Sequence, residues 1–262
     1  MPVLFDMNAR ALRRDRAARN GVELFLYERA FADCLERIAL IGRKFERALL
    51  IGCPDPSWPG RLREFAGQVE VRDPGPRFAA AAGGATIIED DWTPEPESYD
   101  LVLAIGTLDT VNDLPRALTS VFRSLRPGSL FLGAVSGGDT LPQLRSAMRA
   151  ADLVTGIASP HVHPRIEASA IAPLLSHAGF VTPVVDVDRA QVSYTSFEDL
   201  ITDLRKMGAT NLLSARSPQS LSKPALAAAR QRFAAAADGS RTVETFEILH
   251  FAAWTPPAFP AA

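Results

Sequence analysis

The stretch RALLIGCPDPSWPGRL, Arg47 to Leu62, indicates a strand that runs into a turn. Its apolar run, Ala48 to Ile51, is typical of a central parallel strand that is buried on both faces of a sheet. Gly52 ends this run, at the place where nucleotide-binding α/β domains bring bare backbone against a ligand. Pro54 and Pro56 then remove two backbone N–H donors from the following turn. The stretch therefore predicts the frame of a cofactor site with a damaged centre.

The composition excludes several classes of protein. A chain of 262 residues, 47% of them hydrophobic, is long enough to form one domain with a single core. Its net charge of −2 gives no general attraction to nucleic acid or to an anionic membrane, so we expect a protein or small-molecule partner. No apolar run approaches the roughly 20 residues of a membrane span, and Cys34 and Cys53 are too few for a disulfide framework. We expect a bacterial, cytoplasmic protein without an integral membrane segment, and the sequence leaves its oligomeric state open.

The predicted organisation is a single domain, residues 1–262, with two helical additions. The first is an N-terminal helical segment, residues 1–45, whose opening carries five arginines. Asp6 and Asp15 interrupt this basic stretch and no secretory apolar region follows, so we expect a solvated basic helix rather than a targeting sequence. The second addition is a helical insertion, residues 195–242.

Apolar runs and turn residues predict an alternation of strands and helices. Strands are expected at Ala48–Ile51, Gln68–Arg72, Ala85–Ile88, Tyr99–Ile105, Ser129–Val135, Val181–Tyr194 and Val243–Trp254. Helices are expected at Glu23–Lys44, Arg77–Ala82, Asn112–Leu125, Thr140–Ala150 and Ser169–Ala178. This order predicts an α/β fold with a Rossmann-like seven-stranded sheet, mainly parallel, in which the last two strands form an antiparallel hairpin at the edge. That layout matches the class I methyltransferases better than the dehydrogenases.

Several segments resemble one family, the methyltransferase-like assembly factors of respiratory complex I. They are LFDMNARALRRDRAARN (Leu4–Asn20), VNDLPRAL (Val111–Leu118), GAVSGGDTLPQLR (Gly133–Arg145), SPHVHP (Ser159–Pro164), LLSHAGF (Leu174–Phe180) and VDVDRAQVSYTSFEDLITDLRKMGATN (Val185–Asn211). The resemblance implies a class I methyltransferase fold, S-adenosylmethionine in the site, and action on a protein subunit during complex I assembly, by methyl transfer or arginine hydroxylation. More distantly, the chain is similar to the carrier-protein methyltransferases of biotin synthesis.

The chain departs from the family pattern at the centre of the cofactor site. Leu50 replaces an acid that would accept a hydrogen bond from the methionine amino group, and Pro54 and Pro56 fall in the loop where the family has glycines. Losing one charge-assisted hydrogen bond costs about 1.5–3 kcal/mol. We therefore expect S-adenosylmethionine binding to be weak or lost, and to improve when Leu50→Asp is combined with Pro54→Gly and Pro56→Gly. Asp109 and Thr110 stand where the resemblance implies a histidine and an aromatic residue, so no catalytic residue is assigned.

The candidate cofactor-binding residues follow the carboxyl ends of predicted strands. They are Gly52, Cys53, Asp73, Asp90, Asp91, Ile105 and Gly106. Asp73 lies where a carboxylate can accept from ribose hydroxyls, although Asp-Pro-Gly-Pro is also strong turn chemistry. Asp90 is placed to accept from the adenine amino group, with a solvated acidic loop as the alternative. Gly106 permits close approach of the methionine part of the ligand.

The candidate substrate pocket consists of the loop Gly137, Gly138, Asp139 and Thr140 together with His161. This loop follows a strand at the carboxyl edge of the sheet, where ligands of α/β folds bind. The alternative is a flexible loop in which Asp139 or Thr140 caps a helix. His161 and His163 lie on one face of an extended segment without a third ligand, so we expect no metal site.

Two hypotheses of function remain. The first is an adenosylmethionine-dependent enzyme that modifies a protein; the retained Asp73, Asp90 and GGDTL loop favour it. The second is a methyltransferase-like scaffold with a degenerate cofactor loop that binds an assembly partner; the proline-filled loop favours it. A titration with S-adenosylmethionine distinguishes them.

Overall fold

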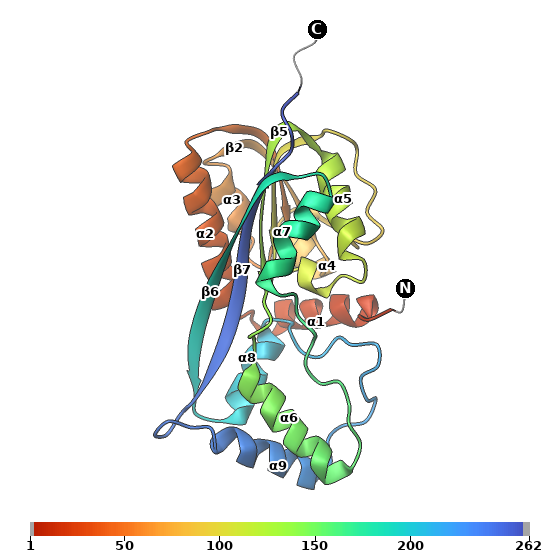
Figure 1. Ribbon diagram of the computed structural model, residues 1–262, viewed down its shortest axis with the longest axis vertical. Helices are drawn as coiled ribbons and strands as arrows, with labels where there is room; N and C mark the ends of the chain where they lie inside the picture. Colours follow the sequence, from red (N-terminus) through yellow and green to blue (C-terminus); the bar gives the residue numbers. More distant parts are fainter. Residues whose placement is uncertain (1–2, 259–262) are drawn as a thin grey trace.

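The computed structural model describes residues 3–258 and contains one seven-stranded sheet, with strand order β3-β2-β1-β4-β5-β7-β6 (Figure 1). The strands are β1 (Phe45–Ile51), β2 (Ala66–Asp73), β3 (Ala85–Thr86), β4 (Tyr99–Ile105), β5 (Leu125–Ser136), β6 (Val181–Tyr194) and β7 (Thr242–Trp254). The first five pair in parallel, whereas β7 is antiparallel to both β5 and β6. This confirms the predicted mainly parallel sheet with an antiparallel pair at its edge.

Helices cover both faces of the sheet. They are α2 (Phe25–Ile41), α3 (Trp58–Leu62), α4 (Pro76–Ala81), α5 (Leu114–Ser124) and α7 (Ala168–His177). Because successive strand residues point to opposite faces, Leu50 packs in one apolar cluster with α2 and α3, while Leu49 packs in the other with α5 and α7. Every residue of β4 is buried, so this strand lies at the centre of the two-sided core.

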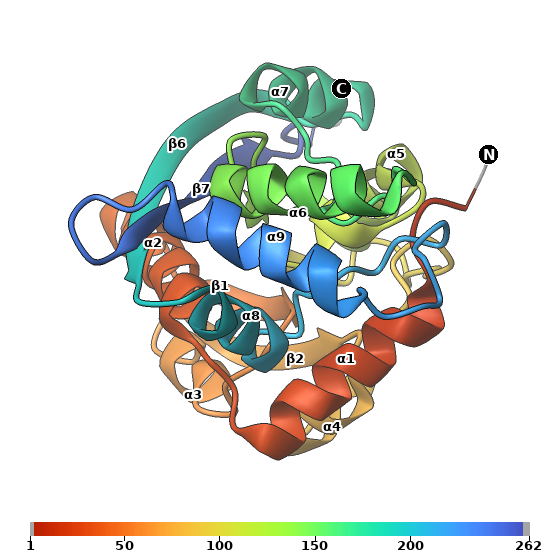
Figure 2. The same ribbon diagram turned by 90° about the horizontal axis from the view of Figure 1, so that it is seen from below.

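A further group of helices lies beyond the carboxyl ends of the parallel strands. It consists of α1 (Met7–Asn20), α6 (Pro142–Thr155), α8 (Phe197–Lys206) and α9 (Lys223–Ala234). The view from below shows α6 and α9 side by side, with α8 and α1 across the same end of the molecule (Figure 2). Leu144, Leu200 and Phe233 belong to an apolar cluster that joins α6, α8 and α9. This helical layer therefore forms the floor beneath the edge of the sheet where the candidate site lies.

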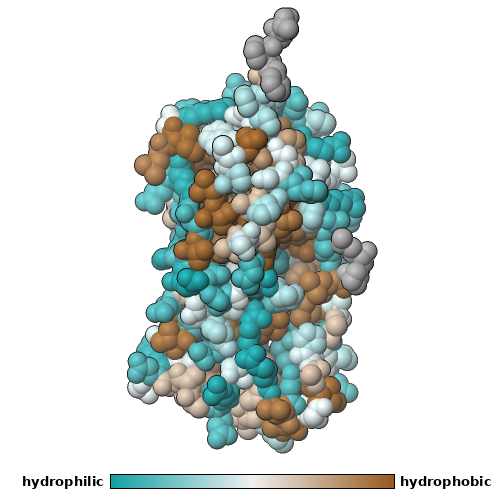
Figure 3. All heavy atoms as spheres, in the orientation of Figure 1, coloured by the Kyte–Doolittle hydropathy of each residue, from teal (hydrophilic) through white to brown (hydrophobic). Residues whose placement is uncertain are grey.

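Most predicted elements are confirmed, with shifts of a few residues at their ends. β4 and β6 have the predicted bounds, and α8 and α9 supply the helices expected within residues 195–242. The predicted third strand is too long, because β3 stops at Thr86 and Ile88 is 48% exposed beyond it. Within residues 3–258, no helix is long and apolar enough to cross a membrane. The visible surface mixes hydrophilic and apolar patches over its whole length (Figure 3).

Candidate functional site

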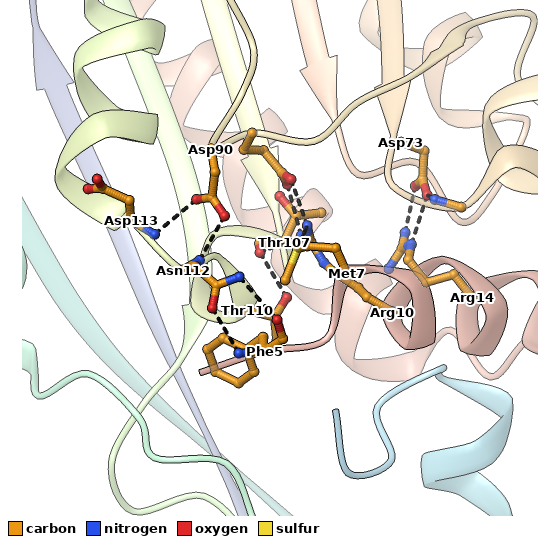
Figure 4. A network of polar contacts seen from close by, with 12 residues as sticks. Phe5, Met7, Arg10, Arg14, Asp73, Asp90, Thr107, Thr110, Asn112 and Asp113 are labelled. Atoms are coloured by element: carbon orange, nitrogen blue, oxygen red, sulfur yellow. Dashed lines mark hydrogen bonds and ion pairs between the residues drawn. The ribbon is translucent and has the colours of Figure 1, made fainter. Parts of the chain in front are cut away.

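The candidate site lies where β1, β2 and β4 end, and helix α1 runs across it. Asp73 is the last residue of β2, and Ile105 is the last residue of β4. Figure 4 shows Arg10 and Arg14 of α1 pointing from the helix toward these strand ends. The parallel topology thus gathers the predicted carboxylates at one edge, and the N-terminal helix brings cations to them.

Arg14 saturates the carboxylate of Asp73. Its Nε donates to Oδ1 at 2.7 Å and its Nη2 to Oδ2 at 2.5 Å. The backbone N–H groups of Cys53 and Gly75 also donate to this carboxylate, at 2.7 and 2.6 Å. Asp73 is fully buried and Arg14 is 5% exposed, so neither charge is solvated. The oxygens that were predicted to accept from a ribose are engaged by four protein donors.

Arg10 makes a second buried pair one helical turn earlier. It donates to both carboxylate oxygens of Glu89, at 2.6 and 2.9 Å, and to the carbonyl oxygen of Thr107 at 2.7 Å. A third contact holds the segment before α1 against the loop before α5, because the side-chain oxygen of Asn112 accepts a hydrogen bond from the backbone N–H of Phe5 at 2.8 Å (Figure 4). The predicted solvated basic helix is therefore wrong for these two arginines, which are buried against acids from the strand ends.

The loop after β1 offers few free donors to a ligand. Gly52 has φ +83°, and a Cβ there would lie 2.3 Å from the carbonyl oxygen of Ile105, so only glycine fits. The N–H groups of Gly52 and Cys53 donate to Arg72 and Asp73, and Pro54 has none. Burial raises the pKa of the Cys53 thiol to about 12, so this cysteine is not a thiolate at neutral pH.

Asp90 and Asp91 lie on the loop after β3. The two oxygens of Asp90 accept from the backbone N–H groups of Asn112 and Asp113, at 2.9 and 3.0 Å, and so hold the loop before α5. The side chain of Asp91 is exposed. Their assignment to cofactor binding stays a prediction.

Two small cavities lie beside the ends of β2 and β4. One of about 90 Å³ is lined by Ile105, Gly106 and Tyr27, among others, and one of about 50 Å³ lies between Arg10, Arg14 and Tyr27. Tyr27 covers Gly106, since a Cβ at that glycine would lie 2.7 Å from its ring. Cavities that hold cofactors have volumes of about 300–1,000 Å³. Helix α1 and Tyr27 occupy much of the space at these strand ends, so neither of the two cavities reaches that volume.

The floor of the 90 Å³ cavity carries a buried ion pair between Asp109 and Arg165. Asp109 Oδ1, Arg165 Nε and Thr107 Oγ1 are buried without a hydrogen-bond partner among residues 3–258. Asp109 stands where the resemblance implies a histidine, and it is paired with an arginine instead of being free to act as a base. Burial also raises the pKa of Tyr27, whose hydroxyl donates to the carbonyl oxygen of Met207.

Of the predicted substrate-pocket residues, Gly138, Asp139 and Thr140 line one surface cavity of about 400 Å³, whereas Gly137 and His161 are not part of its lining. Thr140 also lines the 90 Å³ cavity, whereas Asp139 lies at the surface and pairs with Arg189 at 3.0 Å. Gly137 and Gly138 pack closely against the side chains of Glu247 and Glu167, which leaves no space for a Cβ. His161 lies on a different pocket and contacts Asp152 at 2.7 Å. Their substrate role stays a prediction.

His163 has a structural role that the sequence did not reveal. It is 3% exposed, and its Nε2 accepts from the backbone N–H of Leu212 at 2.8 Å. Phe5 contacts its ring edge-on, with the centroids 5.3 Å apart. Burial, with help from Arg165 and other nearby arginines, lowers the pKa of His163 to about 3, so this side chain is neutral.

Sequence reasoning missed Arg10, Arg14, Glu89, Tyr27 and Arg165 as residues of the site. The spacing of the two arginines could have indicated that they act together. Residues four apart lie on one face of a helix, so Arg10 and Arg14 point the same way. The acids at the strand ends were noted, but nothing placed the helix opposite them.

Comparison with known proteins adds family relationships to this geometry. A family model described as a methyltransferase domain matches residues 24–183. Arginine-hydroxylase NDUFAF5, mitochondrial, of Rattus norvegicus is 32% identical over 265 residues, which cover 96% of this chain and 77% of that protein. Malonyl-[acyl-carrier protein] O-methyltransferase of Nitrosospira multiformis is 32% identical over 162 residues, which cover 62% of this chain and 51% of that protein.

Solved structures show the same fold at low sequence identity. The YcgJ protein of Bacillus subtilis has a TM-score of 0.59 at 12% identity, and covers 88% of this chain and 100% of its own. The N-methyltransferase NodS of Bradyrhizobium japonicum, solved with S-adenosyl-L-homocysteine, has a TM-score of 0.52 at 16% identity, with coverage of 95% and 99%. At these identities the likeness concerns the fold alone.

Proposed function

This chain belongs to the methyltransferase-domain family and to the family of the arginine-hydroxylase NDUFAF5, and from that premise we propose that it is a protein-binding member whose cofactor cleft is closed by its own helix α1. It acts as a scaffold for a protein partner during assembly of respiratory complex I, without adenosylmethionine chemistry. The proposal keeps the bacterial, cytoplasmic setting expected from the sequence, whereas the arginine-hydroxylase relatives are named as mitochondrial proteins.

The buried pair between Arg14 and Asp73 is the observation that carries this proposal. A ligand ribose would need the Asp73 oxygens as acceptors, but Arg14 and two backbone N–H groups already donate to them. Binding would require removal of a guanidinium from a carboxylate in a buried site, which leaves both charges to be compensated anew. The expected weak or lost binding thus gains a structural cause, independent of the loop prolines.

The reaction machinery implied by the resemblance is also altered. Asp109 replaces a histidine and is paired with Arg165, and Thr110 replaces an aromatic residue. Leu50 replaces the acid that would hold the methionine amino group, and it is buried among apolar side chains. These three changes favour the scaffold over the enzyme.

Calorimetric titration of the full chain with S-adenosylmethionine tests the proposal. We expect no saturable binding at low-micromolar concentrations. Two double variants of α1 are then compared. Arg10→Gln/Arg14→Gln removes the cations from Glu89 and Asp73. The control, Arg13→Gln/Arg16→Gln, removes the same charge from α1 and leaves both of these ion pairs intact. Low-micromolar binding by the unmodified protein would overturn the proposal.

A second candidate function is a gated enzyme, and the retained Asp73, Asp90 and GGDTL loop favour it. In this case a partner draws α1 away from the strand ends and thereby opens the cofactor cleft. Arg10→Gln/Arg14→Gln would then bind adenosylmethionine while the unmodified protein and the Arg13→Gln/Arg16→Gln control would not. Circular dichroism must first show that both variants are folded, because Arg10→Gln/Arg14→Gln breaks two buried pairs. If all three proteins are folded and none binds, the gated enzyme is refuted and the scaffold stands.

A further inference from the structure

A larger cavity, of about 410 Å³, lies within the helical layer and adjoins the closed cleft. It is bounded by α6, α8, the start of α9 and the loop around residues 161–165 (Figure 2 shows the helices). Its apolar walls consist of Leu144, Met148, Phe197, Ile201, Leu221 and Leu226. The volume falls in the range of small-molecule pockets, about 300–1,000 Å³.

The ionisable side chains that line this cavity are all basic. Its lining includes Arg165, Arg205, His161 and His163, and no aspartate or glutamate. Asp152 contacts His161 at 2.7 Å but is not part of the lining. A ligand with a negative group would therefore meet cations and no acid in the walls.

The two arginines of the lining, Arg165 and Arg205, have unused hydrogen-bonding capacity. Arg165 is buried and pairs with Asp109 through Nη1, while its Nε is without a partner among residues 3–258. Arg205 lies in the last turn of α8, and no hydrogen bond or ion pair of its side chain occurs in the described part of the chain. His163 is neutral and its Nε2 already accepts from Leu212, so it offers no charge.

We propose that this cavity binds a small amphipathic anion: a carboxylic acid with a medium-length apolar body, whose carboxylate lies toward Arg165 and Arg205. The apolar walls favour the hydrocarbon part, because burying one methylene group contributes about 0.8 kcal/mol, which is roughly fourfold in affinity. The guanidinium groups supply planar donors that match a carboxylate. The proposal goes beyond the proposed function: of the residues it uses, only Arg165 also lines the closed cleft, where it pairs with Asp109.

Isothermal titration of the full chain with decanoate tests this site. We expect saturable binding of one molecule per chain, and octanoate should bind about fifteenfold more weakly because it lacks two methylene groups. Decanol tests the contribution of the charge, and decylamine tests its sign. Decanol should bind more weakly than decanoate, and decylamine should not compete.

A matched pair of variants locates the site. Arg205→Glu replaces an attractive charge on the lining by a repulsive one, so decanoate affinity should fall about five- to tenfold. Lys206→Glu makes the same change in net charge at the next position of α8, outside the lining, and should leave affinity within about twofold. Circular dichroism checks that both variants are folded.

Three results would overturn the proposal. Equal affinity for decanoate, decanol and decylamine would show that the cavity does not select an anion. Equal effects of Arg205→Glu and Lys206→Glu would show that the anion binds elsewhere or responds only to net charge. Absence of saturable decanoate binding up to millimolar concentration would show that the cavity takes no such ligand.

Discussion

Breaking the ion pair between Arg14 and Asp73 should destabilise the protein strongly. Arg14→Met leaves a fully buried carboxylate with two backbone donors and no cation, and Asp73→Asn leaves a buried guanidinium without its anion. Arg14→Met removes both hydrogen bonds of the pair, and Asp73→Asn removes the anion and at least one of them. Removing one partner of a buried pair typically costs about 3–5 kcal/mol. Natural domains have free energies of unfolding of about 5–15 kcal/mol, so both variants should fold with a much reduced margin.

Urea denaturation followed by circular dichroism measures this effect, and a double-mutant cycle isolates the pair. Arg14→Met/Asp73→Asn should cost at least about 2 kcal/mol less than the sum of the two single variants, because neither buried charge remains. The control is Arg126→Met, which breaks a surface pair with Glu46 whose side chains are 40% and 79% exposed. Such exposed pairs contribute about 0.2–1 kcal/mol.

The refuting result is a loss of less than 1 kcal/mol for Arg14→Met, equal to that of Arg126→Met. It would mean that Arg14 is solvated and that α1 does not close the cleft in solution. The scaffold proposal would then lose its main support, and the adenosylmethionine-dependent enzyme would become the better hypothesis.

Two further predictions concern His163 and Leu50. In the folded state the pKa of His163 is lowered to about 3, below the usual value of about 6.5. The contribution of the neutral His163 side chain to the free energy of unfolding is therefore fully present above pH 6.5. It is lost as the pH falls toward 3, by about 1.4 kcal/mol per pH unit. Glutamine does not titrate, so the free energy of unfolding of His163→Gln should fall about 2 kcal/mol less than that of the unmodified protein between pH 6.5 and 5. Urea denaturation at each pH measures this difference. Parallel pH profiles for the two proteins would contradict the prediction. Leu50→Asp should lower the melting temperature sharply, since it buries a carboxylate in an apolar cluster. It should also create no adenosylmethionine binding. A stable variant that binds adenosylmethionine would refute this expectation.

The last of these predictions differs from an expectation drawn from the sequence, and the titration decides between the two. The sequence indicated that an acid at position 50, with glycines at Pro54 and Pro56, would repair the cofactor loop. In the fold Leu50 is fully buried among side chains of α2, α3 and neighbouring strands. Repair of the loop alone also leaves Arg14 on Asp73, so it does not open the cleft.

The sheet could be predicted because its strands carry local signals. Tyr99–Ile105 is a continuous apolar run, and its bounds in the fold are those expected from the sequence. The third strand was overestimated for the same reason, since Ile88 looks like a strand residue but has no neighbouring strand to pair with and lies exposed. Apolar runs report burial, whereas the end of a short edge strand depends on its neighbours.

The closure of the cleft could not be predicted from local signals. Arg10 and Arg14 are separated from Glu89 and Asp73 by 79 and 59 residues. A basic helix with charges on more than one face is most often solvated. Only the packing of α1 across the strand ends distinguishes these two arginines from Arg13 and Arg16.

The arginines of α1 reach Asp73 and Glu89 but not position 50. Asp73 and Glu89 lie within reach of Arg14 and Arg10, so each keeps a permanent cation where a bound ligand would supply only a transient partner. Position 50 lies inside an apolar cluster that no cation of α1 contacts, and an acid there would be a buried charge without a partner. Leucine removes that cost, so Leu50 and the two arginine pairs are both compatible with the proposed scaffold, in which the chain itself fills the cleft.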